Sequence, residues 1–206
     1  MAQAKPIYGV HPGVLMTQKW IAELKDKSGR SLEEWLAFVS RKGPKDEAGR
    51  RDWLKKEHGL GTNTAWWLAE RSFGKGLEDG DPKLYLQAAE GYVEAMFTGK
   101  KEALRPLYDR LLRLGLELGK DVKACPCKTI VPLYRNHVFA EIKPATNTRI
   151  DFGLALGDLK KPPKCLIDTG GFAKKDRITH RFAISGLGDI DHEVERWAKA
   201  AYDRDL

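Results

Sequence analysis

Three short runs of alternating apolar and polar residues follow one another in Thr129–Leu154, TIVPLYRNHVFAEIKPATNTRIDFGL. In the middle run, VFAEIK, the alternation predicts that Phe139 lies with Glu141 and Lys143 on the face opposite Ala140. A period of two over runs this short is typical of antiparallel strands that pack one face against a core. The sequence therefore predicts an antiparallel meander in this part of the chain.

Helical patterns precede the meander. Apolar residues recur at helical spacing in four segments that end near Arg71, and Ser31 with Glu34 forms a capping-box pattern. Residues 73–81, FGKGLEDGD, are rich in glycine and charge and are typical of a linker. We therefore predict a small all-helical domain at residues 1–75.

The remaining residues, 81–206, predict a second domain. Asp81-Pro82 fits the start of a helix, a further helix is expected at Lys100–Leu118, and Asp189 is expected to cap a last helix. Residues 179–184 alternate like another strand. The predicted fold class is α+β: an N-terminal four-helix domain followed by an antiparallel β-sheet packed against helices.

The composition is that of a globular protein. Of the 206 residues, 42% are hydrophobic and 32% are charged, and only three are cysteines. An odd, small cysteine count argues against a disulfide framework and favours a reducing compartment. No apolar run approaches the roughly 20 residues that span a bilayer, and the N-terminal residues lack the apolar segment of a signal peptide. We expect a cytoplasmic protein without a membrane partner.

Positive charge is concentrated in the first third of the chain. The formal net charge is +7; residues 1–75 hold 14 Lys and Arg against 9 Asp and Glu, and residues 76–206 hold 22 against 20. A basic segment attracts phosphates, although the same excess also suits a solvated surface. The helical domain is thus the candidate for contact with a polyanion.

The first candidate site is a turn between two predicted helices, in WLKKEHGLGTNTAWWLA, Trp53–Ala69. Its Gly-hydrophobe-Gly turn resembles a helix-hairpin-helix, a motif that holds nucleic-acid phosphates with backbone N–H groups. A hairpin whose glycines serve only the turn is the alternative. The residues predicted to bind nucleic acid or another anion are Lys55, Lys56, Gly59, Gly61 and Arg71.

The second candidate site is the polar face of the sheet. Charged residues on neighbouring strands can either form cross-strand pairs or hold a carboxylate or phosphate. The residues of this alternative pocket are Tyr134, Arg135, Lys143, Arg149, Asp151, His180 and Arg181. His180 alternates in register with Phe182, which favours a histidine in or beside the core over a catalytic base.

No metal, cofactor or catalytic residues are predicted. Cys125-Pro126-Cys127 would supply two thiolates, but a structural zinc site needs four ligands, and only Cys165 and scattered histidines remain. We found no Gly-rich phosphate loop and no Ser/His/Asp arrangement.

Two segments resemble known families. HPGVLMTQKWIAELKDKSGRSLEEWLAFV with WLKKEHGLGTNTAWWLA resembles a small helical bacterial family, domain of unknown function 4287. LRPLYDRLLRLGLELGKDV, the meander and THRFAISGLGDIDHEVERWAKAAYD resemble domain of unknown function 5655. The resemblance implies a fusion of the two in this order over nearly the whole chain. The cysteine pair departs from the Pro-Lys-Lys-type residues expected there, which further weakens a metal site.

These observations give three hypotheses of function. The leading one is a non-enzymatic binding protein that contacts nucleic acid or another polyanion through the basic helical hairpin. The second is a small-molecule anion-binding protein, or an enzyme, that uses the polar sheet face. The third is a protein–protein interaction module, which an exposed apolar patch would favour.

Overall fold

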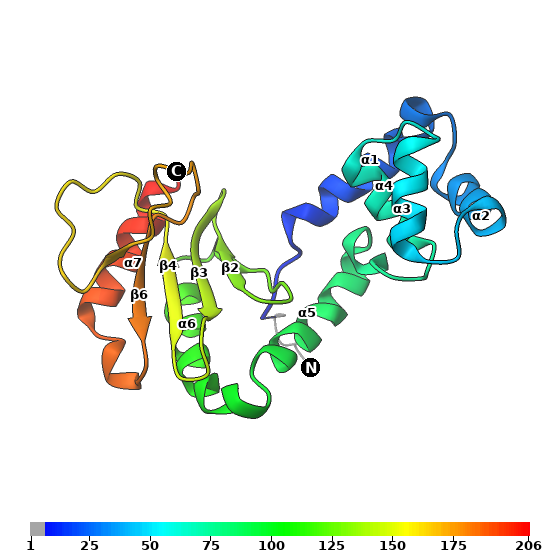
Figure 1. Ribbon diagram of the computed structural model, residues 1–206. Coiled ribbons are helices and arrows are strands. Elements are labelled where there is room, and N and C mark those ends of the chain that lie inside the picture. Colours follow the sequence, from blue (N-terminus) through cyan, green and yellow to red (C-terminus); the bar gives the residue numbers. More distant parts are fainter. Residues whose placement is uncertain (1–6) are drawn as a thin grey trace, which may run out of the picture. The chain divides into compact units, whose positions relative to one another are not determined.

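The computed structural model describes residues 7–206 and confirms the predicted α+β class (Figure 1). Helices fill the N-terminal half, and an antiparallel six-stranded sheet and a C-terminal helix follow. The chain divides into a helical unit, Val10–Gln87, and a sheet unit that combines Ala88–Leu206 with the described residues 7–9. The predicted domain bounds, 1–75 and 81–206, stay a prediction; residues 1–6 lie outside the described residues.

The helical unit contains four helices, a 3-10 turn and the first part of a fifth helix. Capping side chains stabilise the starts of most of these helices: Ser31 Oγ accepts from Glu34 N, and Glu34 Oε2 accepts from Ser31 N at 2.7 Å, as the capping-box pattern predicts. Asp81 Oδ1 accepts from the amides of Lys83 and Leu84 at the start of the fifth. The elements are α1 (Pro12–Ser28), α2 (Leu32–Lys42), α3 (Glu47–Lys56), α4 (Thr62–Arg71), η1 (Leu77–Asp79) and α5 (Pro82–Met96).

An apolar cluster with an aromatic centre holds the helical unit together. Trp35 is buried, its indole N–H donates to Ser28 Oγ at 2.7 Å, and its ring meets those of Phe38 and His58 edge-on. Aromatic pairs in this geometry add to the free energy gained from area burial. The buried members of the cluster are Leu24, Trp35, Val39, Leu54, Ala65, Leu68 and Ala69.

The sheet unit is built on one antiparallel sheet with the strand order β1-β2-β3-β4-β6-β5. The central strands β2, β3 and β4 form the predicted meander, and Phe152 of β4 lies opposite Ile142 of β3 and Phe182 of β6. The strands are β1 (Lys123–Ala124), β2 (Val131–Tyr134), β3 (Val138–Pro144), β4 (Ile150–Leu154), β5 (Ile167–Asp168) and β6 (His180–Ile184).

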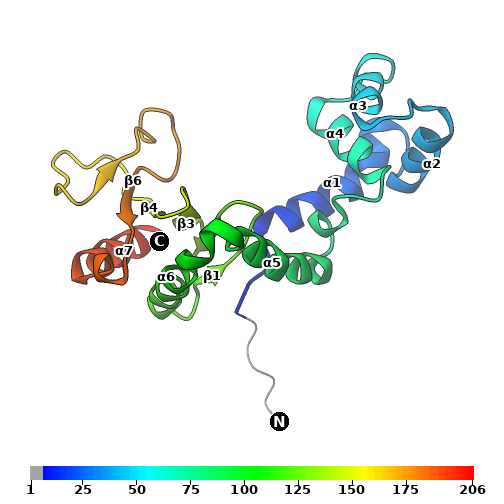
Figure 2. The same cartoon turned by 60° about the horizontal axis from the view of Figure 1, so that its bottom comes forward.

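Two helices cover one face of this sheet. Helices α6 (Arg105–Glu117) and α7 (His192–Arg204) both contact β3 and β4, and they run along the same side of the sheet (Figure 2). Gly115 lets α6 approach β2 closely, because a Cβ there would overlap the Leu133 side chain. The 3-10 segments η2 (Gly99–Leu104) and η3 (Leu187–Asp189) precede α6 and α7.

Three details differ from the sequence predictions. Phe139 does not share the polar face: the β2–β3 register shifts beside it, and Phe139 is fully buried with its ring edge-on to Tyr202 at 5.7 Å. Such a bulge bends the strand and interrupts its alternation. The cap of α7 is Asp191, whereas Asp189 ends η3 and accepts from the Ser185 amide. The helix predicted at Lys100–Leu118 begins as the 3-10 segment η2.

Within residues 7–206, no helix is both long enough and apolar enough to cross a membrane.

Candidate functional site

The turn between α3 and α4 exposes backbone at both of its glycines. Gly59 has φ +64°, a left-handed conformation that glycine adopts without strain. Gly61 is the N-cap residue of α4, and a Cβ added at Gly59 or Gly61 would meet nothing within 4 Å. Between them the Leu60 amide donates to Leu54 O at 3.2 Å, which anchors the turn to α3. The turn is therefore held in shape while its glycine backbone stays open to a ligand.

The start of α4 has no side-chain cap. The first amides of any α-helix lack intrahelical acceptors, and the helix dipole gives them a partial positive charge. In α1, α2, α3 and α7 a side chain of the N-cap residue accepts from these amides, but Gly61 offers none to α4. Thr62 and Asn63 in the first turn are exposed, and the first turn contains no acidic residue. This helix start can accept an anion from outside.

The lysines and the arginine of the predicted site lie in different places. Lys55 and Lys56 are exposed in the last turn of α3, beside the glycine turn. Arg71 ends α4, roughly 14 Å along the helix from Thr62 at 1.5 Å per residue. It is only 4% exposed, with its guanidinium 5.5 Å from the Trp20 ring centre, and burial lowers its pKa. The structure thus joins Lys55 and Lys56 with the glycine turn, and it places Arg71 elsewhere.

The polar face of the sheet is a network of internal ion pairs. Asp151 Oδ1 accepts from Arg149 Nε at 2.9 Å and from Arg181 Nη1 at 3.0 Å. Glu141, opposite Gly153 and next but one to Lys143, is half-buried, and burial raises its pKa. Three basic residues and two carboxylates lie on this face, so most of its charge is compensated within the sheet and little positive charge remains for an anion.

The other members of the predicted sheet-face pocket lie elsewhere. His180 faces the core, opposite Leu154, where burial lowers its pKa. Arg135, after β2, pairs with Asp121 at 2.9 Å and stacks its guanidinium over the Tyr202 ring at 4.4 Å. Tyr134 ends β2 opposite Val138, at the bulge. The structure does not gather the seven residues around one cavity.

The cysteine pair lies at the start of the sheet. Burial raises the pKa of Cys125 to about 12, which disfavours the thiolate that metals bind. Among residues 7–206, no group of three or more His, Cys, Asp or Glu side chains is placed to hold a metal ion.

A buried carboxylate that the sequence did not point to joins three segments of the sheet unit. Asp205, after α7, is 3% exposed, and its Oδ2 accepts from the backbone amides of Asn136 and His137 at 3.0 and 2.8 Å. Its Oδ1 meets His137 Nδ1 at 3.0 Å and forms an ion pair with Arg177. Burial acts to raise the pKa of Asp205, but these hydrogen bonds and the Arg177 charge outweigh it and lower the pKa. The β2–β3 turn is thereby tied to the end of α7.

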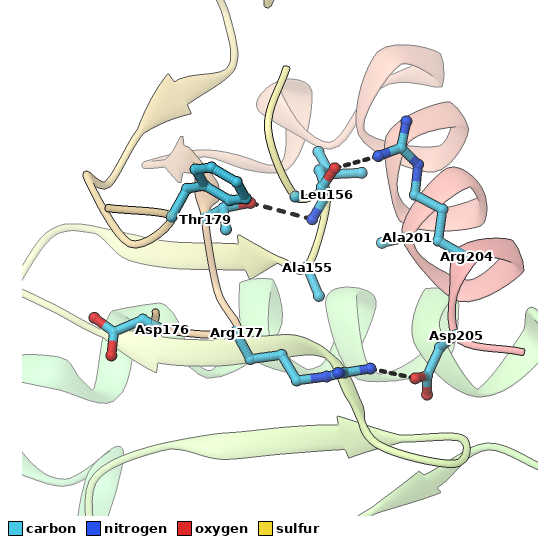
Figure 3. Close-up of a pocket in the computed structure, with 10 residues that line it drawn as sticks. Ala155, Leu156, Asp176, Arg177, Thr179, Ala201, Arg204 and Asp205 are labelled. Atoms are coloured by element: carbon cyan, nitrogen blue, oxygen red, sulfur yellow. Dashed lines mark hydrogen bonds and ion pairs between the residues drawn. The ribbon is translucent and has the colours of Figure 1, made fainter. Parts of the chain in front are cut away.

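Beside Asp205 lies a cavity of about 290 Å³ (Figure 3). Its walls are residues 155–157 after β4, the loop before β6, and the last turn of α7. The polar and charged residues that line it are Asp176, Arg177, Thr179, Arg204 and Asp205. These residues come from segments far apart in the sequence, so no local sequence motif predicts that they share a cavity.

Comparison with protein families classifies both halves of the chain. Residues 93–205, which are more than half of the chain, match the model of the family described as Domain of unknown function (DUF5655). The chain belongs to the DUF5655 family. Residues 16–71 match the model of Domain of unknown function (DUF4287), so the predicted fusion and its order are confirmed. No match was found among curated proteins or solved structures.

The two candidate sites fall in different family segments. The DUF4287 segment contains the α3–α4 turn and ends at Arg71. The DUF5655 segment contains the whole meander, the cavity and Asp205, its last matched residue. Both family descriptions leave the function open.

Proposed function

We propose that this protein is a non-enzymatic binding protein that contacts nucleic-acid phosphates through the α3–α4 turn. The residues of the proposed site are Gly59, Gly61, Lys55 and Lys56. The observation that supports it most is the start of α4 at Gly61, where the exposed first turn has no side-chain cap. A phosphate oxygen would supply the acceptor that Ser31 or Asp46 supplies to α2 or α3.

The glycines and lysines suit a phosphate backbone for separate reasons. Without Cβ atoms, Gly59 and Gly61 let a phosphate come close to the backbone amides. Lys55 and Lys56 add two exposed positive charges within one helical turn of Gly59. Contacts of this kind recognise the phosphate backbone rather than the bases, so we propose binding without strong sequence preference.

A polyanion fits this turn better than a single small anion. One helix N-terminus and two lysines on an open surface bind an isolated phosphate weakly, whereas a strand of phosphates also gains from the counterions that it releases. Residues 1–75 hold 14 basic and 9 acidic residues, and this excess of positive charge also favours a polyanion. We propose in addition that the protein acts in the cytoplasm, the location predicted from the sequence.

Replacing both lysines tests the electrostatic part of the site. In Lys55→Gln/Lys56→Gln we expect weaker binding to labelled single-stranded and duplex DNA of about 20 nucleotides, because two phosphate contacts are lost. The slope of log K against log salt concentration should become shallower by about 2 units, at about one unit per lysine. Fluorescence anisotropy over a salt titration measures both quantities.

The control variant is Lys42→Gln/Lys45→Gln, which removes the same amount of charge from two exposed positions, the last residue of α2 and the link that precedes α3. It should keep most of the affinity and nearly the wild-type slope. No wild-type binding to DNA or RNA at low salt, binding without a salt slope, or equal losses in the two double variants would each refute the proposal.

A further inference from the structure

The cavity beside Asp205 has a polar floor that is already held in place. Thr179 Oγ1 accepts from the Leu156 amide at 3.2 Å and shares a hydrogen bond with His180 Nδ1 at 2.9 Å. Thr179 and His180 are both buried, so this chain of hydrogen bonds is shielded from water. The backbone at Leu156, in the middle of the cavity in Figure 3, is therefore fixed before any ligand arrives.

One of the two guanidinium groups that line the cavity is already neutralised. Arg177 donates to Val138 O at 2.9 Å and forms an ion pair with Asp205, so its charge is compensated by a buried carboxylate. Asp205 is in turn saturated by Arg177 and the Asn136–His137 turn. This pair shapes one wall and contributes little net charge.

The other guanidinium keeps its charge. Arg204 donates from Nη1 to the Leu156 carbonyl oxygen, a neutral acceptor, and no ion pair joins it to a carboxylate within residues 7–206. Its remaining N–H groups are available for a planar acceptor. Asp176 also lines the cavity, but Figure 3 shows its carboxylate directed away from Arg177 and Asp205. The positive charge left to bind an anionic group is that of Arg204, which lies on the opposite side of Leu156 from Asp176 in Figure 3.

The rim of the cavity carries an aromatic ring that the fold leaves uncovered. Phe172 is 58% exposed and belongs to the lining. Its loop is held by hydrogen bonds from the Lys174 and Asp176 amides to Gly171 O at 3.0 and 2.9 Å. A Cβ at Gly171 would overlap the backbone oxygen of Ile178, so the loop is packed closely onto the backbone that precedes β6. The phenyl group is therefore held at the opening of the cavity, where contact with the apolar part of a ligand would shield it from water.

We propose that this cavity binds a small organic anion: a carboxylate on Arg204, joined to a flat apolar body that lies beside Phe172. The volume of about 290 Å³ is at the lower end of ligand pockets, which suits a molecule with a single ring. A guanidinium matches a carboxylate through two parallel hydrogen bonds, whereas it repels an amine. This site is separate from the proposed nucleic-acid site, and neither proposal depends on the other.

Benzoate is the probe that matches this chemistry. We expect the full-length protein to bind benzoate saturably in NMR titrations, with the shifts centred on residues 155–157 and 172–179. Benzyl alcohol and benzylamine, which keep the ring and lack the carboxylate, should bind at least tenfold more weakly. Binding of benzylamine as tightly as benzoate, tighter binding of inorganic phosphate than of benzoate, or no saturable benzoate binding would overturn the proposal.

Two variants and a matched control locate the binding. Arg204→Gln should weaken benzoate binding at least tenfold, while Arg196→Gln, an exposed arginine on the same helix that pairs with Glu193, should leave it unchanged. Phe172→Ser lies on the surface and leaves the fold intact even if Arg204→Gln does not, and it should weaken binding several-fold. Unchanged benzoate affinity in Phe172→Ser, or equal effects of the two arginine variants, would contradict the assignment.

Discussion

Asp205→Asn is expected to lower the free energy of unfolding of the sheet unit by about 2–3 kcal/mol, because hydrogen bonds to a buried charged group are worth about 1.5–3 kcal/mol each and only part is recovered by the amide. The new amide nitrogen would face donors: either Arg177 and His137 or the amides of the β2–β3 turn lose their acceptor. Urea unfolding at neutral pH, followed by circular dichroism, measures the loss.

The pH dependence gives this prediction a second readout. Because the folded-state pKa of Asp205 is below the unfolded value of about 4, its stabilisation is complete above that pH. It disappears as the pH falls through the folded-state pKa. The wild type and Asp205→Asn should therefore converge in stability under acid conditions. Asp203→Asn removes an exposed carboxylate from the last turn of α7 and should cost less than about 0.5 kcal/mol. A similar small loss for Asp205→Asn would show that the carboxylate does not hold the turn.

Phe152→Ala is expected to cost more, about 3–5 kcal/mol, which is the usual effect of removing a buried phenyl group. Phe152 is fully buried on the middle strand β4, and its neighbours across the sheet are Ile142 and Phe182. The substitution would leave a void at the centre of the core, and the rigid strands on both sides would limit how far neighbouring side chains can move in to fill it. Thermal unfolding followed by near-ultraviolet circular dichroism measures the loss, and failure to accumulate folded protein is the extreme form of it.

Two further variants bracket the Phe152 result. Phe152→Leu keeps most of the apolar volume and should lose less than the alanine variant. Phe172→Ala removes the same side chain from an exposed loop and should change stability by less than about 0.5 kcal/mol. Equal stabilities of Phe152→Ala and Phe172→Ala would contradict the placement of β4 in the middle of the core.

The parts of the fold that were predictable are those set by local physics. Alternation with a period of two was sufficient for the meander, and the side-chain caps at Ser31 and Asp81 marked where helices begin. The burial of Phe139 was not predictable, because it depends on a bulge and on the ring of Tyr202, which is distant in the sequence. Tertiary packing overrides a local pattern wherever the two disagree.

The candidate sites divide in the same way. The glycine turn was visible because its residues are contiguous, and the structure contains that turn between α3 and α4; its role in binding stays a prediction. Arg71 looked like a surface charge, yet it lies three residues after Leu68 on the buried side of α4, a spacing that could have indicated its burial. The Asp205 contacts and the cavity bring together segments up to 69 residues apart. A pattern of neighbouring residues contains no information about such contacts.

The most direct test of the nucleic-acid proposal is the DNA affinity of Gly61→Asp compared with Gly61→Ala. Gly61 has an extended backbone with φ −60° and free space around its Cβ position, so both substitutions fit. Aspartate would cap α4 from within and occupy the amides that we assign to a phosphate, and it should keep or slightly raise the melting temperature. We predict that Gly61→Asp binds DNA at least tenfold more weakly than Gly61→Ala at low salt. Equal affinities of the two variants would contradict the proposal that the start of α4 holds a phosphate.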